Sequence, residues 1–252
     1  MAKPAKSKPF ASEVALCAAF IAALPDGWTA YAETEGWDIL LVRTADGFQI
    51  GVQAKLRLNV DVVNQAIENG YSYHVAGPGP DCRAILVPDV AAAFDKICDY
   101  VGVTIIRMRD LAARGLNPRY NSHFFPGLPK PNDLWEQWHE MAPAKRYKLP
   151  EYVPDVAAGA SAPLQLTDWK IRAIKIAVLL EERGFVDRLD FKYLQIDHRR
   201  WVANGWLKVE NGRFLRDACP DFRTQHPLVY EKIKADAPRW RPAAKPEQTA
   251  LL

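Results

Sequence analysis

The chain has 252 residues, of which 49% are hydrophobic and 25% charged, and its formal net charge at pH 7 is +3. This composition is typical of one large or two small globular domains, and any basic surface for nucleic acid has to be local. No apolar run approaches the roughly 20 residues that a membrane-spanning helix needs, and no cleavable secretory segment follows the basic N-terminus, so no membrane partner is expected.

The four cysteines include no C-x-x-C pair, which argues against a zinc site of the usual spacing. Cys17 and Cys98 stand in apolar helical contexts and are interpreted as core thiols. Together these features predict a reduced, cytoplasmic protein.

The first part of the chain alternates between helical and strand patterns. The expected elements are helix 11–24, strands 28–34, 38–43 and 48–56, a helix from Asn59 to just before Gly70, strands 71–76 and 84–87, helix 89–100 and strand 101–107.

The Asp-Gly dipeptide at 46–47 is typical of a two-residue hairpin turn between strands 38–43 and 48–56. In that register Asp38 lies directly opposite Lys55 and diagonal to Gln53. Alternation along the second strand places Gln53 and Lys55 on the same face. Three polar side chains therefore converge on a hairpin that is otherwise apolar.

Helix 11–24 adds a fourth polar group, because Glu13 belongs to the same apolar stripe as Cys17 and Phe20. A carboxylate on a core-facing stripe costs several kcal/mol unless it is paired or bound to a metal. Oxygen ligands beside a lysine suit phosphodiester hydrolysis, in which Mg²⁺ polarises the phosphate and the lysine stabilises charge or helps to deprotonate water.

The order Glu13, Asp38 and Gln53-Ala54-Lys55 resembles the PD-(D/E)XK superfamily, and its spacing is most similar to the archaeal Holliday-junction resolvase and restriction-like branches. The following Gln65-Ala66 and 71–76 segments resemble the helix and strand that follow the lysine in many members. The resemblance covers roughly residues 10–107. It implies an α/β, restriction-endonuclease-like core in the order α-β-β-β-α-β.

The resemblance also implies the site residues. The Asp38 and Gln53 side chains and the Ala54 carbonyl would hold Mg²⁺ or Mn²⁺, Lys55 would be the catalytic lysine, and Glu13 would be an auxiliary ligand, direct or through water.

Gln53 departs from the family, which usually has Asp or Glu at this position. A few restriction enzymes of the superfamily carry Gln-x-Lys, but a neutral amide is a weaker ligand for a hard cation, so a non-catalytic scaffold stays an alternative. Gln65 is either a helix-surface amide or a site-lining group. Glu33 and Glu35 could also enter the site, but a solvated loop is the expectation for both, and His74 is expected in the core rather than as a ligand.

Prolines recur between the two halves of the chain, and we expect a meandering connection there, with a short helix over 132–141 and its most linker-like stretch at 155–163. The expected divisions are a nuclease-like domain at 1–115, the connection at 116–165, a second domain at 166–237 and a disordered tail at 238–252.

Residues 167–216 resemble winged helix-turn-helix domains in general, giving a small α+β domain. Thr167 caps a helix that ends at Gly184, a short helix follows, and Asp197 caps a third helix. A hairpin with an Asn-Gly turn at 211–212 forms the wing. A single closing helix is expected over 221–236.

If this domain binds DNA, the third helix enters the major groove and the surrounding basic side chains contact phosphates. Trp201 and Trp206 are interpreted as core residues. The expected DNA-binding residues are Lys192, His198, Arg199, Arg200, Lys208, Arg213 and Arg216.

The sequence therefore predicts a cytoplasmic, Mg²⁺- or Mn²⁺-dependent DNA endonuclease whose winged helix positions it on a duplex, a junction or a flap. Two alternatives stay open: a non-catalytic DNA-binding or regulatory protein on a degenerate nuclease scaffold, and a winged-helix module that binds protein. The expected partner is DNA, and a homodimer is left open.

Overall fold

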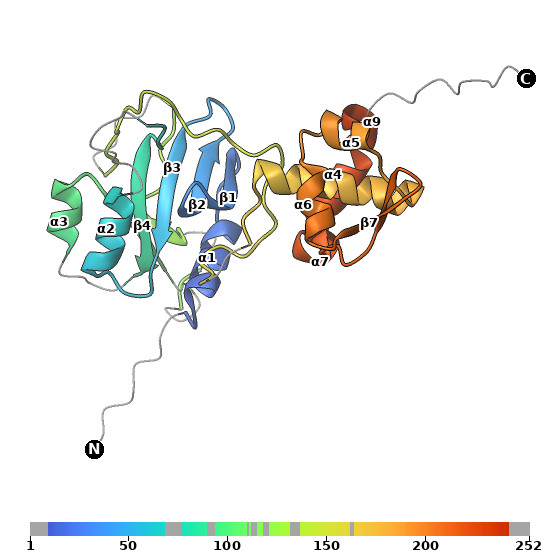
Figure 1. The fold of residues 1–252 in the computed structure, drawn as a ribbon. Helices are drawn as coiled ribbons and strands as arrows, with labels where there is room; N and C mark the ends of the chain where they lie inside the picture. The colour runs from blue at the N-terminus through green and yellow to red at the C-terminus, as the bar shows by residue number, and fades with distance from the viewer. Residues whose placement is uncertain are drawn as a thin grey trace, which may run out of the picture. The chain divides into compact units, whose positions relative to one another are not determined.

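The computed structural model of the chain forms two compact units (Figure 1). The N-terminal unit comprises Met1–Leu149 and Val156–Gln165, and the C-terminal unit comprises Pro150–Asp155 and Leu166–Leu252. The residues that the structure describes are 10–68, 77–89, 94–109, 111, 115–117, 121–131, 137–161 and 164–241.

The N-terminal unit is built on a six-stranded mixed sheet whose strands follow one another in chain order, which confirms the mixed α/β class. The first three strands pair antiparallel, the third to fifth pair parallel, and the last pairs antiparallel. The strands are β1 (Trp28–Thr34), β2 (Trp37–Arg43), β3 (Gln49–Ala54), β4 (Cys82–Pro88), β5 (Thr104–Met108) and β6 (Phe124–Phe125).

Helices cover both faces of this sheet, so the central strands are apolar on both sides (Figure 1). Helix α1 (Glu13–Ala22) packs with Ile39 and Leu41 on one face. Helices α2 (Val60–Glu68) and α3 (Asp95–Tyr100) pack with Leu40 on the other.

The described residues of the Pro-rich connection add to this core. Trp138 and Ala158 belong to the layer that contains α1, and Tyr147 to the layer that contains α2. Gly159 has a φ of +75°, and a Cβ there would lie 3.0 Å from the Cys17 sulfur. Within the linker-like stretch expected at 155–163, Ala158 and Gly159 therefore pack with the α1 layer, whereas Asp155 belongs to the C-terminal unit.

The β2–β3 hairpin differs from the expected register by two residues. Arg43 N–H donates to the Phe48 carbonyl, and the turn is a four-residue loop rather than a two-residue one. The reason is Asp46: it accepts two hydrogen bonds from the Arg43 guanidinium and one from the Phe48 N–H, so it closes the loop from inside. Asp38 consequently lies opposite Gln53, one pair beyond Ile39–Val52, and Lys55 is its diagonal neighbour.

Other expectations for the N-terminal unit are confirmed or corrected at their boundaries. Strand 28–34 is confirmed as expected, and Asn59 caps α2 by accepting from Val62 N–H. Within the described residues, the helix expected over 89–100 covers 95–100, and residues 137–141 of the helix expected over 132–141 are not helical. Strand 71–76 with His74 lies outside the described residues.

The C-terminal unit begins with three helices and a hairpin in the order that the sequence predicts. Thr167 caps the first helix, Gly184 ends it with a φ of +73°, and Asp197 caps the third. The elements are α4 (Asp168–Arg183), α5 (Arg188–Tyr193), α6 (His198–Ala203), β7 (Leu207–Glu210) and β8 (Arg213–Arg216).

Beyond the hairpin, the single closing helix expected over 221–236 is wrong. Pro227 has no N–H to donate, so it starts a new helix, and the segment forms α7 (Phe222–Gln225) and α8 (Pro227–Ala235). The segment expected to be disordered instead begins with α9 (Ala237–Trp240), whose Trp240 is buried and donates from Nε1 to the Ile233 carbonyl.

This unit has its own core around α4. Trp201 is buried at its centre as expected, while Trp206 packs against it partly buried. None of the helices described in the chain is long and apolar enough to cross a membrane.

Candidate functional site

A row of polar side chains crosses β1, β2 and β3 near one end of the sheet. Glu33 and Asp38 fall opposite each other, between the Ala32–Ile39 and Thr34–Trp37 pairs. Asp38 in turn falls opposite Gln53. Glu33 has a φ of +50°, so β1 is irregular at this point, and the three side chains are brought together as lining residues of one pocket.

The β1–β2 turn explains why Glu33 is in this row. Glu35 and Gly36 have φ values of +54° and +81°, which is typical of a two-residue type I′ turn. The expectation of a solvated loop is right for Glu35, which is exposed, and wrong for Glu33, which is 8% exposed. The signal was present in the sequence, because a Glu-Gly turn at 35–36 pairs position 33 with position 38.

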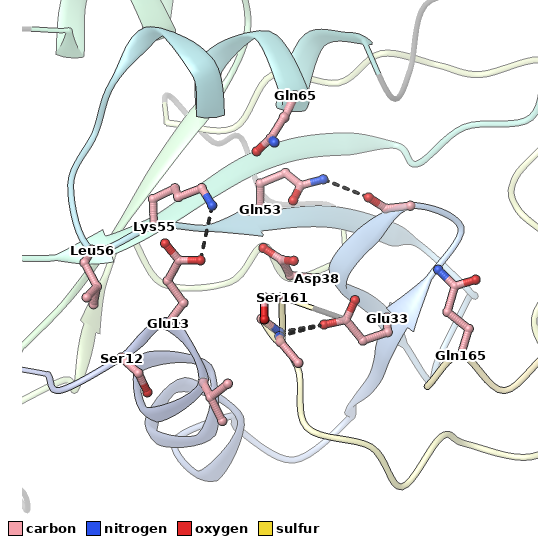
Figure 2. A pocket seen from close by; sticks show the side chains of 14 residues that line it. Ser12, Glu13, Glu33, Asp38, Gln53, Lys55, Leu56, Gln65, Ser161 and Gln165 are labelled. Carbon is pink, nitrogen blue, oxygen red and sulfur yellow. Dashed lines mark hydrogen bonds and ion pairs between the residues drawn. The ribbon is translucent and has the colours of Figure 1, made fainter. Parts of the chain in front are cut away.

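Hydrogen bonds fix the members of the row, and Figure 2 shows those of Gln53 and Glu33. Asp38 Oδ2 accepts from the Ala54 N–H at 2.7 Å. The Gln53 side-chain amide donates to the Gly36 carbonyl at 2.9 Å, which ties the β1–β2 turn to β3. The strand-end carboxylate and amide are therefore held by backbone groups of neighbouring strands.

Lys55 follows β3 directly and points towards α1. Its Nζ lies 3.2 Å from Glu13 Oε2 (Figure 2). The inward-facing position predicted for Glu13 on the first helix therefore brings it to the predicted catalytic lysine.

A segment remote in sequence closes the site. Glu33 Oε1 accepts from the Gly159 N–H at 2.7 Å and from the Ala160 N–H at 3.3 Å. A Pro-rich connection gives no periodic pattern from which this contact could be predicted.

The carboxylates of Glu13, Glu33 and Asp38 interact electrostatically. Burial raises the pKa of Asp38, and the Glu13 charge raises it further, while the Ala54 N–H and Lys55 oppose the rise. Burial and the charge on Asp38 likewise raise the pKa of Glu33. Burial raises the pKa of Cys17 to about 12. The negative charges of Asp38, Glu33 and Glu13 add to the rise, so all three carboxylates act electrostatically on this thiol.

These groups line a pocket of about 690 Å³, which we call the strand-end pocket. Gln65 lies on α2 and lines it, which answers the question that the sequence left open (Figure 2). Most of the lining side chains are polar. The residues are Ser12, Glu13, Val14, Glu33, Gly36, Asp38, Gln53, Lys55, Leu56, Gln65, Gly159, Ala160, Ser161 and Gln165.

The oxygen donors of the pocket suit a hard divalent cation. One oxygen of each of Glu33, Asp38 and Gln53 accepts no hydrogen bond from the residues that the structure describes. Among the described residues, no three His, Cys, Asp or Glu side chains already converge as a metal-ligand group. Mg²⁺ commonly binds one or two carboxylates and keeps several waters, so the donor set fits that ion without such a group.

The basic residues of the C-terminal unit divide into two sets. Arg199 and Arg200 are exposed on α6, without a side-chain partner within the described part of the chain. Lys208 pairs with Glu210 at 2.8 Å, and the Arg213 guanidinium lies 4.1 Å from the centre of the Phe185 ring. Alternation places Lys208 and Arg213 on the face of the hairpin opposite Val209 and Phe214.

His198, Lys192 and Arg216 differ in their surroundings. The His198 ring packs on Phe191 and Phe214, so it is half-buried rather than freely presented. Lys192 and Arg216 are exposed, at the end of α5 and of β8 respectively.

A groove of about 740 Å³ lies between α5, α6 and the hairpin. Arg188, which no sequence motif singles out, lines it beside Arg199. The apolar part of the lining includes Val209, which is 54% exposed. The groove residues are Arg188, His198, Arg199, Val202, Ala203, Val209, Gly212 and Phe214.

Comparison of the chain with models of protein families, with curated proteins and with solved structures finds no match.

Proposed function

We propose that this protein is a Mg²⁺- or Mn²⁺-dependent DNA endonuclease, with a PD-(D/E)XK, restriction-endonuclease-like core in its N-terminal unit. The single observation that carries the proposal is that Glu13, Asp38, Gln53 and Lys55, which the sequence motif groups together, line one pocket. They come from α1, β2 and the end of β3, so their convergence is a property of the fold.

Each residue has a role that its contacts support. Asp38 and the Gln53 carbonyl oxygen would hold the cation, with the Ala54 carbonyl, and Glu13 would be an auxiliary ligand. A divalent cation bound there would polarise the scissile phosphate and lower the pKa of a bound water. The Lys55 ammonium would stabilise negative charge on the phosphate. In the protein without DNA, the ion pair with Glu13 keeps this ammonium directed into the pocket.

The C-terminal unit is proposed to be a winged helix that holds DNA. Its support is an α4–α5–α6 arrangement followed by a two-stranded hairpin, with Arg199 and Arg200 exposed on α6. Arg188, Lys192 and Arg216 add positive charge for phosphate contacts.

Incubation with supercoiled plasmid, a four-way junction and single-stranded DNA tests the proposal. Cleavage of at least one substrate is expected with Mg²⁺ or Mn²⁺, and none with EDTA. A protein that binds DNA but cleaves nothing with either metal would contradict the catalytic role.

A specific contact favours a second candidate, the non-catalytic DNA-binding protein. The Gln53 side-chain amide donates a hydrogen bond to the Gly36 carbonyl. This structural role explains why glutamine occupies position 53 even if the protein is not an enzyme. The cleavage assay decides between the two, because only the enzyme turns over its substrate. The apolar lining of the groove supports the protein-binding alternative. Phosphate contacts make DNA affinity fall steeply with salt, so this alternative predicts that any DNA affinity lacks the steep salt dependence.

A further inference from the structure

The strand-end pocket contains a buried acid that the sequence motif does not include. Glu33 is 8% exposed, lies opposite Asp38 across β1 and β2, and lines the same pocket. We propose that Glu33 is a ligand of the divalent cation and supplies the carboxylate that position 53 lacks. This inference rests on the proposed function, because it names a residue for the same site.

The hydrogen bond made by Gln53 explains why the carboxylate is supplied by position 33 and not by position 53. Its amide nitrogen donates to the Gly36 carbonyl, and a carboxylate at this position would instead bring an oxygen against that carbonyl. The side chain is 6% exposed and lines the pocket, and its own carbonyl oxygen accepts no hydrogen bond from the described residues. This oxygen is not one of the buried side-chain atoms that lack a partner, so it is accessible from the pocket and available to a bound cation.

The charge balance of the pocket leaves room for a dication. Glu13, Glu33 and Asp38 line it, and Lys55 is paired with Glu13. Glu33 and Asp38 have no cationic side chain as an ion-pair partner in the described part of the chain. Like charges on a buried and a half-buried acid in neighbouring strands repel each other, and a cation bound by both would offset this repulsion.

Glu33 is also held in a defined position. Gly159 and Ala160 N–H groups occupy its Oε1, which leaves Oε2 as the oxygen available to a ligand. Asp38 is held in the same manner, with Oδ2 on the Ala54 N–H and Oδ1 available. Each acid therefore has one oxygen fixed by the backbone and one oxygen left over.

The test measures Mn²⁺ binding by calorimetry in the absence of DNA, for the wild type and for Glu33→Gln. Glutamine keeps an oxygen that can accept from Gly159 but has no charge. We expect Mn²⁺ affinity to fall by at least roughly 10–100-fold, because losing a group that only supports a metal ligand already has an effect of this size. Without metal, the melting temperature should stay the same or rise, because a buried charge beside Asp38 has been removed. Glu35→Gln, an exposed neighbour in the same turn, is the matched control and should bind Mn²⁺ as the wild type does.

Wild-type Mn²⁺ affinity in Glu33→Gln overturns the inference, as does a wild type that binds no Mn²⁺. A lower metal-free melting temperature with unchanged affinity would show that Glu33 only supports the fold. A second measurement needs no variant: on titration with Mg²⁺, the carboxyl ¹³C resonance of Glu33 should shift and that of Glu35 should not. A stationary Glu33 resonance at saturating Mg²⁺ overturns the inference even if Glu33→Gln fails to fold.

Failure of this inference is distinct from failure of the proposed function. If Mn²⁺ binding depends on Glu33 but no DNA is cleaved, the inference stands and the nuclease proposal fails. If DNA is cleaved and Glu33→Gln binds Mn²⁺ normally, the nuclease proposal stands and the inference fails.

Discussion

Lys55 Nζ lies 3.2 Å from Glu13 Oε2, so the residue after β3 and the first residue of α1 meet at the strand-end pocket. The side chains are 31% and 32% exposed, and ion pairs of this exposure contribute about 1 kcal/mol or less to stability. The pair therefore matters more for where the ammonium points than for whether the chain folds.

Lys55→Ala should abolish DNA cleavage while changing the free energy of unfolding by less than about 1 kcal/mol. The ammonium that stabilises charge on the phosphate is removed, but little packing goes with it. Plasmid nicking is compared with urea denaturation for the same preparation. Lys96→Ala, an exposed lysine on α3, is the control and should cleave normally. Equal nicking by Lys55→Ala and the wild type would remove Lys55 from the site.

Gln53→Glu should destabilise the metal-free protein by about 1–3 kcal/mol, because the Gly36 carbonyl loses its donor and a new charge lies opposite Asp38. With Mn²⁺ the melting temperature should rise at least as much as it does for the wild type, because a carboxylate is the better ligand for a hard cation. Thermal melting of both proteins with and without Mn²⁺ measures this. No rise in either protein would count against the Asp38–Gln53–Lys55 site.

The contribution of Asp38 and Glu33 to the stability of the metal-free protein should fall as pH rises above about 4. The pKa of Asp38 and that of Glu33 are both raised, so the folded state holds these protons more tightly than the unfolded state does. Their stabilising contribution is present below the unfolded pKa values and is lost as pH rises through the folded ones. Asp38→Asn should flatten this decline, measured by urea denaturation in EDTA.

Asp46→Asn provides the control of opposite sign. Its hydrogen bonds from Arg43 lower the pKa of Asp46 to about 2, so its contribution is present near neutral pH and is lost only in strong acid. This variant should keep the full decline above about pH 4, which Asp38→Asn reduces. Parallel pH profiles for Asp38→Asn and the wild type would contradict the account of the buried acids.

Arg199→Ala combined with Arg200→Ala should weaken DNA binding and reduce the slope of log affinity against log salt by about one unit for each phosphate that the arginines no longer neutralise. Gel shifts at several salt concentrations measure the slope. Lys232→Ala with Arg239→Ala removes the same charge from exposed positions on α8 and α9 and serves as the control. An unchanged slope in the α6 variant would favour the protein-binding alternative.

Trp240→Ala should destabilise the C-terminal unit by about 3–5 kcal/mol, the usual cost of deleting a buried large aromatic side chain. Its ring packs in the core around α4, and its Nε1 donates to Ile233. Denaturation of the full chain measures the loss. Arg239→Ala, an exposed neighbour on α9, is the control and should leave this unit close to wild-type stability.

The sequence predicted the helices and strands of the site better than their exact pairing. The β2–β3 register was wrong by two residues, yet Gln53 and Lys55 stayed close to Asp38, because side chains repeat every two residues along a strand. A shift of one residue would have placed them on the opposite face. The hydrogen bonds from Arg43 to Asp46 favour the observed four-residue loop. Turn propensities consider the residues of the turn alone and do not include such a side-chain pair.

Glu33 and Gly159 mark two different limits of prediction. Glu33 was predictable, because the Glu-Gly turn at 35–36 fixes its partner, but the pattern of neighbouring polar residues suggested a solvated loop. The contact of Gly159 with Glu33 was not, since it joins segments 126 positions apart through backbone N–H groups. Every residue except proline has a backbone N–H, so residue type does not show which N–H groups bind a side chain. A Pro-rich segment also lacks the periodic pattern from which the position of these groups could be predicted.

The route of the chain near residue 150 decides how this protein can be dissected. The chain enters the C-terminal unit at 150, returns to the N-terminal unit at 156 and leaves it again after 165. A fragment that stops at 149 loses the N–H groups that hold Glu33, and one that starts at 166 loses Asp155, which pairs with buried His226 and accepts from the first turn of α8. No single cut yields two intact halves, so the gene is best probed by point substitutions in the whole chain.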